Sequence, residues 1–312
     1  MAIKKVETGI PGFDLISEGG LPEQRTTLVT GSAGSAKTVL AAQFLAEGIR
    51  NEKSSGVFVT FEESPSDLRK NLISLGWDIT AWEEKGKWMF IDASPVVEEE
   101  TIEIGSYDLG GLLSRIEHAV NSIGAERVIL DSLGSVFNLF ENKQIIRGEL
   151  FRISNALKQL GVTTIMTSER GEEYGAISRY GVEEFVTDNV IILRNNLEEE
   201  KRRRTIEILK FRGTDHQRGE FPFTILPKKG VEIIPLSAIE LRQSSSDVRV
   251  TSGNKDIDEM CGGGFFRDSV ILVSGATGTG KTLMTTEFID GGIKNGEKCM
   301  LFAFEESREQ LL

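Results

Sequence analysis

Two glycine-rich segments of this chain end in Lys-Thr, a combination of residues that binds the phosphates of a nucleotide. The second reads Gly275-Ala-Thr-Gly-Thr-Gly-Lys281-Thr282 and matches the phosphate-loop pattern G-x-x-x-x-G-K-[ST] in full. In such a loop, backbone N–H groups and the positive end of the following helix hold the phosphates. The lysine meets the outer phosphates, and the threonine hydroxyl binds Mg²⁺. We therefore predict nucleotide binding at the second segment, with a chance glycine turn as the alternative.

The first segment reads Gly31-Ser-Ala-Gly-Ser-Ala36-Lys37-Thr38, with alanine where the pattern has its second glycine. A methyl group there narrows the loop beside the phosphates, which weakens binding unless the loop accommodates it. Gly34, Lys37 and Thr38 are all present. We predict nucleotide binding at this segment too, against the alternative of a purely structural loop.

Three carboxylates follow apolar segments that have the composition of buried strands. Asp131 ends Val-Ile-Leu-Asp and precedes Ser132, a place where a carboxylate can hold the water shell of Mg²⁺ at the carboxyl edge of a parallel sheet. A helix N-cap is the alternative role for Asp131. Glu62 and Glu63 also end a strand, where two adjacent carboxylates are costly unless they are solvated or used. One can orient and deprotonate an attacking water while the other bonds to its surroundings, and the pair recurs as Glu305-Glu306.

The chain begins the same series of motifs twice, 244 residues apart. Gly9, Gly31 and Lys37 recur as Gly253, Gly275 and Lys281. Each copy is expected to continue into a helix and a second strand, which ends near Phe61 in the first copy and near Phe304 in the second. A period of this length indicates a duplicated domain, since solenoid repeats are roughly 20–50 residues long. We predict a complete domain over residues 1–247 and the truncated opening of a second over 248–312, and we expect the chain to be part of a longer protein.

Apolar, β-rich segments alternate with helical ones, which predicts an α/β fold with a mostly parallel sheet covered by helices on both faces. The expected buried strands are Thr27–Thr30, Val57–Phe61, Met89–Asp92, Val128–Asp131, Thr163–Thr167 and Val190–Leu193. Apolar residues at helical spacing mark helices around Leu112–Ile123 and Ile146–Leu160. Short alternating strands then predict an antiparallel extension over Thr205–Lys210, Phe221–Ile225 and Val231–Ile234, followed by a polar linker, Gln243–Asp247. In the second copy, strand Val270–Val273 and helix Leu283–Ile293 flank the loop.

The composition is that of a soluble globular protein, with 39% hydrophobic and 27% charged residues. Because no segment has the length of a signal-peptide core or a membrane span, we predict a cytoplasmic location. The net charge of −12 disfavours a surface built to hold nucleic acid. The basic run Lys201–Arg204 is either part of a solvated hairpin turn or a segment whose last arginine reaches a phosphate across a subunit boundary. Cys261 and Cys299 are too few and too isolated for a disulfide framework or a zinc site.

Four longer segments resemble the KaiC family, the circadian clock ATPases and autokinases of the RecA-like superfamily. They are Gly12–Pro22, Gly56–Glu63, Arg179–Val186 and Asp258–Phe266. The resemblance extends over essentially the whole chain. It implies a RecA-like P-loop NTPase fold, two such modules in each full-length chain, and a homohexamer with ATP at the subunit interfaces. It also implies KaiB-like and KaiA-like clock proteins as partners.

The resemblance further implies roles for individual residues. In the first module it assigns ATP contacts to Gly34, Ser35, Ala36, Lys37, Thr38, Val39 and Ser74. Catalytic roles fall to Lys37, Glu62 and Glu63, and Mg²⁺ binding to Thr38 and Asp131. The segment that reaches the ATP of the neighbouring subunit is matched by Lys210, Phe211, Arg212, Thr214 and His216, and the cations Lys210 and Arg212 are catalytic there because they stabilise charge on the γ-phosphate. In the second module the nucleotide-binding residues are Thr277, Gly278, Thr279, Gly280, Lys281, Thr282 and Leu283, and the metal-binding residues are Thr282 and Glu305.

The sequence and this resemblance together predict a slow, Mg²⁺-dependent ATP hydrolase, with serine/threonine autokinase activity expected of the full-length parent. Without the resemblance, Lys210 and Arg212 are two residues on one face of an exposed strand, and His216 is a surface histidine. A RecA-like recombinase or helicase acting on DNA shares the expected fold, although Glu169–Phe185 is rich in glutamate where DNA would require lysine and arginine. A non-catalytic, ATP-dependent scaffold is the other alternative.

Overall fold

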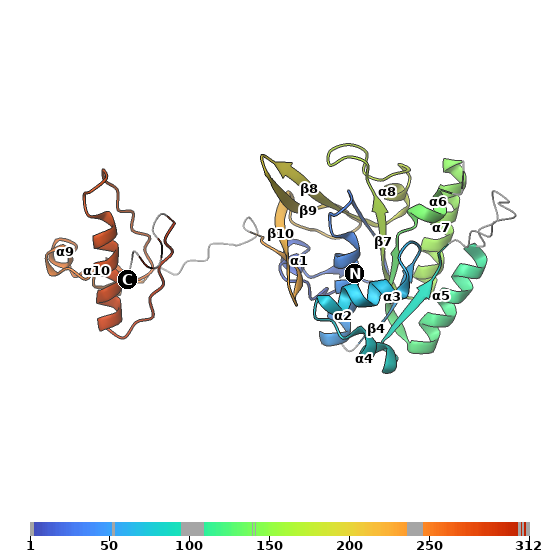
Figure 1. Cartoon of the computed structure of the whole chain (residues 1–312), viewed down its shortest axis with the longest axis horizontal. Coiled ribbons are helices and arrows are strands. Elements are labelled where there is room, and N and C mark those ends of the chain that lie inside the picture. Colours follow the sequence, from blue (N-terminus) through green and yellow to red (C-terminus); the bar gives the residue numbers. More distant parts are fainter. Residues whose placement is uncertain are drawn as a thin grey trace. The chain divides into compact units, whose positions relative to one another are not determined.

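The computed structural model describes residues 3–51, 54–94, 109–138, 140, 142–235, 246–304, 307 and 309. The chain divides into two compact units, Met1–Ile239 (unit 1) and Glu240–Leu312 (unit 2), which are coloured blue to orange and orange to red (Figure 1). The predicted linker, Gln243–Asp247, falls partly outside the described residues. The predicted domain boundary after residue 247 stays a prediction.

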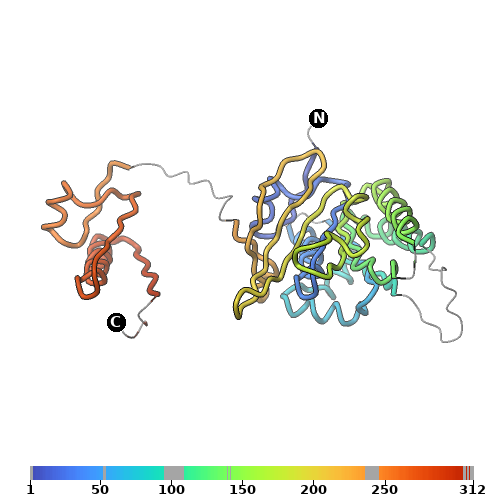
Figure 2. Tube along the Cα trace, turned by 90° about the horizontal axis from the view of Figure 1, so that it is seen from above, coloured from blue at the N-terminus to red at the C-terminus, as the bar shows by residue number. Residues whose placement is uncertain are grey.

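The described part of unit 1 contains a nine-stranded sheet in the order β11-β10-β9-β8-β3-β7-β6-β4-β5. The parallel strands are β3 (Thr26–Gly31), β4 (Ser55–Thr60), β5 (Trp88–Asp92), β6 (Ala125–Asp131), β7 (Thr163–Glu169) and β8 (Asn189–Glu198). The antiparallel extension, in yellow and orange in Figure 2, consists of β9 (Lys201–Phe211), β10 (Glu220–Leu226) and β11 (Gly230–Ile233). The strands predicted for this unit are confirmed.

Helices cover both faces of this sheet. On one face lie α2 (Lys37–Asn51), α3 (Pro65–Ser74) and α4 (Ile79–Glu84), and on the other α5 (Leu109–Ile123) and α7 (Lys143–Gln159). Successive residues of a strand point to opposite faces, so in β4 Phe58 packs in the cluster beneath α2 while Val57 and Val59 pack beneath α5 and α7. Because both faces are covered, all six residues of β4 are buried, which explains the apolar run Val57-Phe58-Val59 at its centre.

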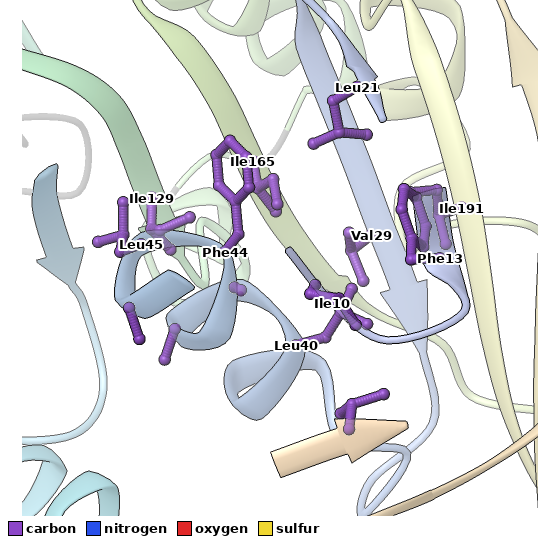
Figure 3. Close-up of a cluster of buried hydrophobic side chains, with 14 of the residues drawn as sticks. Ile10, Phe13, Leu21, Val29, Leu40, Phe44, Leu45, Ile129, Ile165 and Ile191 are labelled. Atoms are coloured by element: carbon purple, nitrogen blue, oxygen red, sulfur yellow. The ribbon is translucent and has the colours of Figure 1, made fainter. Parts of the chain in front are cut away.

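The apolar cluster beneath α2 holds that helix in place. Figure 3 shows Leu40, Phe44 and Leu45 of α2 beside Val29 of β3 and Ile129 of β6. Each of these side chains is at most 1% exposed, and burying one contributes about 1.5–3 kcal/mol. Since α2 begins at Lys37, this packing also fixes the position of the loop that precedes it.

Shorter elements complete unit 1. They are β1 (Lys5–Val6), β2 (Leu21–Pro22), α1 (Phe13–Ile16), α6 (Gly134–Phe137) and α8 (Glu183–Val186). Within the described parts of the chain, no helix combines the length and apolarity that crossing a bilayer requires.

Unit 2 repeats the opening of unit 1. Strand β12 (Arg249–Val250) pairs with β13 (Phe265–Phe266), as β1 pairs with β2. The short helix α9 (Lys255–Met260) follows β12, and α10 (Lys281–Lys294) confirms the helix predicted after the second phosphate loop.

The two longer strands predicted for unit 2 are not formed among its described residues. The predicted strand Val270–Val273 is irregular, with Val270 and Leu272 each 89% exposed, and Phe304, at the end of the other, is 94% exposed. The reason lies in hydrogen bonding, because a strand needs a neighbour to pair its N–H and C=O groups. In unit 1 the equivalent β3 is held between β7 and β8, whereas no described strand pairs with Val270–Val273. An apolar composition alone therefore does not form a strand here.

Candidate nucleotide site

One pocket of unit 1 lies where four parallel strands end. The carboxyl ends of β3, β4, β6 and β7 meet at the same edge of the sheet, as parallel strands require. The residues that line the pocket are Ala33, Gly34, Lys37, Thr38, Thr60, Glu62, Glu63, Asp131, Ser132 and Glu169. The structure thus brings together five side chains that the sequence singled out in separate segments: Lys37, Thr38, Glu62, Glu63 and Asp131.

The first phosphate loop connects β3 to α2, and side chains of the loop and of the start of α2 bond to its backbone carbonyl groups. The Nζ atom of Lys37 donates to the carbonyl oxygens of Gly31 and Ser32, at 2.9 and 3.0 Å, and Ser35 Oγ donates to the Ser32 carbonyl at 2.8 Å. A Cβ atom on Gly31 would lie 2.4 Å from Ser35 Oγ and 2.6 Å from the carbonyl oxygen of Leu193, so glycine is required there. The loop leads directly into the N-terminus of α2, whose first N–H groups have no partner within the helix. Such an end favours anions.

Burial lowers the pKa of Lys37, and the nearby carboxylates of Glu169, Asp131 and Glu62 oppose this shift. The lysine is thus partly desolvated and surrounded by negative charge. An ammonium group in this position can exchange its two carbonyl acceptors for phosphate oxygens, which bind a cation more strongly.

Ala36 takes the backbone conformation of the glycine that it replaces. Its φ is +76°, and the equivalent Gly280 of unit 2 has φ +86°. Its methyl group packs against the apolar cluster beneath α2 and does not line the pocket. The loop therefore accommodates the methyl group without narrowing, and the cost falls on the backbone, since left-handed φ costs an L-residue roughly 1–2 kcal/mol.

We predict that Ala36→Gly does not destabilise unit 1 and stabilises it by up to about 1 kcal/mol, because glycine adopts positive φ without strain. The gain is limited by the lost methyl contact and by the greater entropy of glycine in the unfolded chain. Ala81→Gly, in the helical conformation of α4, is the matched control and should cost about 1 kcal/mol. Urea unfolding of both variants measures the difference. An equal loss of stability in the two would contradict strain at Ala36.

Asp131 is a buried carboxylate at the end of β6. Its Oδ1 accepts a short hydrogen bond from Thr167 Oγ1, and Thr38 also hydrogen-bonds to its carboxyl group. Burial raises the pKa of Asp131, while these two hydrogen bonds and the charge of Lys37 lower it. The alternative role as a helix N-cap is wrong, because the next helix, α6, is capped at Leu133 and no side chain caps it.

The oxygen atoms of Thr38 and Asp131 fit Mg²⁺, which usually takes one or two protein ligands and completes its shell with phosphate oxygens and water. Among the described residues, no group of three or more His, Cys, Asp or Glu side chains could hold a metal alone.

The two adjacent glutamates are held by different partners. Glu62 Oε1 accepts from Ser132 Oγ at 3.0 Å, and Glu63 Oε2 accepts from Asn71 Nδ2 of α3 at 3.3 Å. Burial, followed by the charge of Asp131, raises the pKa of Glu63. Helix α3 begins directly after the pair, with Ser64 accepting from Asp67 N as its N-cap, which fixes where the pair emerges. Both carboxylates face the pocket, where a water molecule could be oriented and deprotonated.

The segment Lys210–His216 lies at the opposite edge of the sheet. Lys210 is paired with Val190, which is in register with Leu28, so its backbone lies about 10 Å before the end of β3 at about 3.3 Å per residue. Its Nζ donates away from the pocket, to the carbonyl oxygens of Glu184 and Thr187 at 2.9 and 2.7 Å. The structure therefore does not bring Lys210 to the phosphate loop of its own chain.

The other residues of this segment also lie away from the pocket of their own chain. Arg212 is 56% exposed and pairs with Asp188 at 3.6 Å, and the Phe211 ring lies beside that of His216, with centroids 5.5 Å apart. Thr214 Oγ1 donates to the carbonyl oxygen of Asp215 at 3.5 Å. These residues do not line the pocket.

Two further predicted contacts also lie outside the pocket lining. Ser74 is the last residue of α3 and donates to the carbonyl oxygen of Asn71 at 2.6 Å. Val39, in the first turn of α2, packs against the apolar cluster. The nucleotide contacts assigned to Ser74 and Val39 stay predictions.

Two acidic residues at or beside the pocket, Glu169 and Glu173, were not predicted. Glu169 lines it, and Glu173 accepts a short hydrogen bond from Ser32 Oγ and another from Asn195 N at 3.0 Å. Arg204 Nε donates to the Gly34 carbonyl at 3.3 Å. Glu169 ends β7, so the position of its strand end could have identified it. The basic run Lys201–Arg204 is in the expected hairpin, but the turn itself is Glu199-Glu200 and the run begins β9.

The second phosphate loop repeats the bonds of the first. Lys281 Nζ donates to the carbonyl oxygens of Gly275 and Ala276 at 2.9 and 3.0 Å, and Thr279 Oγ1 donates to Ala276 at 2.8 Å. The predicted contacts Thr277, Gly278, Gly280, Thr282 and Leu283 belong to this loop and the start of α10, and Leu283 is 65% exposed. Glu305 lies outside the described residues. The loop geometry of unit 2 is thus formed without the surrounding sheet.

Comparisons with known proteins extend over the whole chain. The family model described as "ATPase: KaiC" matches residues 6–238 and 250–312. Circadian clock protein KaiC3 of Synechocystis sp. is 66% identical over 310 residues, which cover 99% of this chain and 61% of the relative. Circadian clock oscillator protein KaiC of Synechococcus elongatus is 55% identical over 311 residues (100% of this chain and 60% of the relative), and that of Thermostichus vulcanus is 54% identical over 309 (99% and 59%). The chain spans about three fifths of the length of these curated relatives.

Proposed function

This chain belongs to the KaiC family of circadian clock proteins and carries its ATPase domain, and from this premise we propose that unit 1 binds ATP with Mg²⁺ and hydrolyses it slowly. The observation that carries the proposal is the convergence of Lys37, Thr38, Glu62, Glu63 and Asp131 on one pocket at the carboxyl edge of the sheet. A phosphate-loop lysine, a hydroxyl and carboxylate pair for Mg²⁺ and a pair of candidate bases are the groups that phosphoryl transfer to water requires.

Each group has a defined task in this mechanism. Lys37 and the N–H groups that open α2 hold the outer phosphates, and Thr38 and Asp131 hold Mg²⁺, which neutralises charge on the phosphate oxygens. Glu62 or Glu63 orients a water molecule opposite the leaving oxygen and accepts its proton. The water oxygen forms a bond to the γ-phosphorus as the bond to the β–γ bridging oxygen breaks, so the products are ADP and phosphate.

We further propose that Lys210 and Arg212 act on ATP held by a neighbouring copy of the chain in a homohexameric ring. Their place at the edge opposite the pocket of their own chain supports this, because it leaves that pocket without a cation from this segment. The other members of the segment, Phe211, Thr214 and His216, would contact the same neighbouring nucleotide. A cation supplied in this way stabilises charge on the γ-phosphate in the transition state.

Several proposals concern the full-length protein. We propose that it is cytoplasmic, that it works with KaiB-like and KaiA-like clock proteins, and that it is also a serine/threonine autokinase. In unit 2 we propose that Thr277–Leu283 bind a second ATP, with Thr282 and Glu305 at its Mg²⁺, once the partner strands of the complete domain are present.

The direct test is release of phosphate from ATP by the 312-residue protein. We expect slow, steady release that stops when Mg²⁺ is chelated. Binding of ATP without any release would instead identify an ATP-dependent scaffold and would contradict the proposed hydrolysis.

Arg212→Ala should leave ATP binding intact and lower hydrolysis in the assembled ring at least about tenfold, because the lost cation acts on the nucleotide of a neighbour. The control is Arg203→Ala, an exposed arginine near the other end of β9 that pairs with Glu198 at 3.1 Å. Rings that mix Arg212→Ala chains with Glu62→Gln, Glu63→Gln chains should regain activity, since an intact pocket then meets an intact Arg212. Absence of recovery would show that Arg212 acts within its own chain.

A further inference from the structure

Asp188 is a fully buried carboxylate that faces three cations at the amino edge of the sheet. Its exposed fraction is 0%, and it lies between α8 and β8. The cations come from three separate elements: Arg25 precedes β3, Lys158 is in the last turn of α7, and Arg212 follows β9. A buried carboxylate needs partners of this kind, because a charge removed from water without them is strongly destabilising.

The two oxygens of Asp188 divide these partners between them. Oδ1 lies 3.3 Å from Arg25 Nη1 and 3.6 Å from Arg212 Nη1. Oδ2 lies 2.7 Å from Lys158 Nζ and accepts from Thr26 N at 3.3 Å. The backbone of Asp188 is itself anchored, since its N–H donates to the Thr26 carbonyl at 3.0 Å. Asp188 is therefore tied to the start of β3 by its backbone and by its side chain.

Residues close to Asp188 in the sequence also bind Lys210 and the backbone of Arg212. Asn189 Oδ1 accepts from the backbone N–H of Arg212 at 3.4 Å, and Asn189 Nδ2 donates to Thr27 Oγ1 at 3.0 Å. Lys210 Nζ is held by the carbonyl oxygens of Glu184 and Thr187. The segment 184–189 thus orients both Lys210 and Arg212 relative to the sheet.

The charges around Asp188 do not cancel. One carboxylate faces Arg25, Lys158 and Arg212, so this group of four keeps an excess of positive charge. Arg212 has the longest of the three ion-pair distances and is the most exposed of the three cations, at 56% against 36% for Arg25 and 29% for Lys158. Its guanidinium is directed by Asp188 but remains able to bind an anion from outside the chain.

We propose that Asp188 is a positioning residue for Arg212, which it orients toward the phosphates of ATP bound by a neighbouring copy of this chain. This inference rests on the proposed function, in which Arg212 acts on that ATP. Asp188 touches no substrate itself and affects hydrolysis only through the guanidinium of Arg212.

The test compares Asp188→Asn with Lys158→Gln in the assembled 312-residue protein. Asparagine keeps the shape and can still accept from Thr26 N, but it loses the charge that orients Arg212. Lys158→Gln removes another ion pair of Asp188 and leaves Arg212 in place. We expect kcat to fall about tenfold in Asp188→Asn with the KM for ATP unchanged, and to stay within about twofold of wild type in Lys158→Gln.

A double variant separates positioning from general stability. If Asp188 acts through Arg212, then adding Asp188→Asn to Arg212→Ala should lower kcat no further, because the group it orients is already gone. In mixed rings, Asp188→Asn chains should recover activity beside Glu62→Gln, Glu63→Gln chains, as Arg212→Ala chains do. Thermal unfolding of each variant records any loss of stability separately from the rates.

Three results would overturn the inference. A multiplied loss in the double variant would show that Asp188 supports the fold independently of Arg212. If Asp188→Asn and Lys158→Gln have equal kcat values while Arg212→Ala is slow, Asp188 does not position Arg212. The proposed function of Arg212 would then be unaffected. An unaffected rate in Arg212→Ala would refute the action on a neighbouring ATP, and with it the positioning role.

Discussion

Replacing Glu62 and Glu63 together with glutamine should strongly slow phosphate release while ATP remains bound. Both side chains line the pocket, and glutamine keeps their size but cannot accept the proton of the attacking water. General-base catalysis contributes typically 10²–10⁴-fold, so we expect turnover to fall by at least about 10²-fold. Single-turnover phosphate release measures the rate, and equilibrium ATP binding shows that the pocket is intact.

A matched control is Glu84→Gln, an exposed glutamate at the end of α4, which should hydrolyse ATP at the rate of the wild type. The two single variants identify the base as the carboxylate whose loss costs more. Because burial raises the pKa of Glu63, a base at that position would be protonated at a higher pH than an ordinary glutamate. Activity should then be present above this raised pKa and decline as the pH falls through it. Turnover by the double variant at the wild-type rate would refute the assignment of the pair.

Lys37→Ala should weaken ATP binding by unit 1 at least about 100-fold, or about 2.7 kcal/mol. The phosphate loop contributes one cation to the pocket, the ammonium group of Lys37. Hydrogen bonds between a cation and a phosphate are among the strongest in proteins. Lys37 also offsets the negative charge of the nearby carboxylates of Glu169, Asp131 and Glu62. Without it, these carboxylates would repel the phosphates of ATP. If ATP lies between subunits, ring assembly should fail as well.

Calorimetric titration with ATP and Mg²⁺ measures this effect, and sedimentation in ATP follows assembly. Lys70→Ala provides the control, since Lys70 is exposed on α3 and pairs only with nearby Asp67 among its ionic partners that the structure describes. An unchanged affinity in Lys37→Ala would mean that the first loop binds no nucleotide, which was the alternative raised by Ala36.

The parallel sheet was predictable because its strands are buried on both faces and their sequences are correspondingly apolar. The position of the pocket was then predictable too, because the carboxyl ends of parallel strands meet at one edge of the sheet. Asp131, Glu62 and Glu63 all lie at such strand ends. Glu169 obeys the same rule at β7 and could have been included. The position of Lys210 and Arg212 at the opposite edge is a consequence of the antiparallel direction of β9, which the predicted extension already implied.

Other features depend on partners that a local pattern does not contain. Glu173 reaches the phosphate loop from a long loop, and nothing in its local sequence indicates that contact. The basic run drew attention to Arg204, but not to its bond with the Gly34 carbonyl of the same chain. Ala36 has the φ of a glycine because the loop must turn there whichever residue is present. The segment Val270–Val273 has the composition of a strand, but no strand among the described residues pairs with it as β7 and β8 pair with β3.

That unpaired segment has a consequence for the behaviour of the chain in solution. Val270-Ile-Leu-Val273 is uncharged, rich in β-branched residues and free of proline, and its surroundings leave much of it open to water. Short segments of this kind, when their backbone is not covered, act as templates on which other extended chains add strands. Val270–Val273 is therefore a segment of unit 2 at which copies of this chain could add strands to one another, and covering its backbone would suppress that self-association.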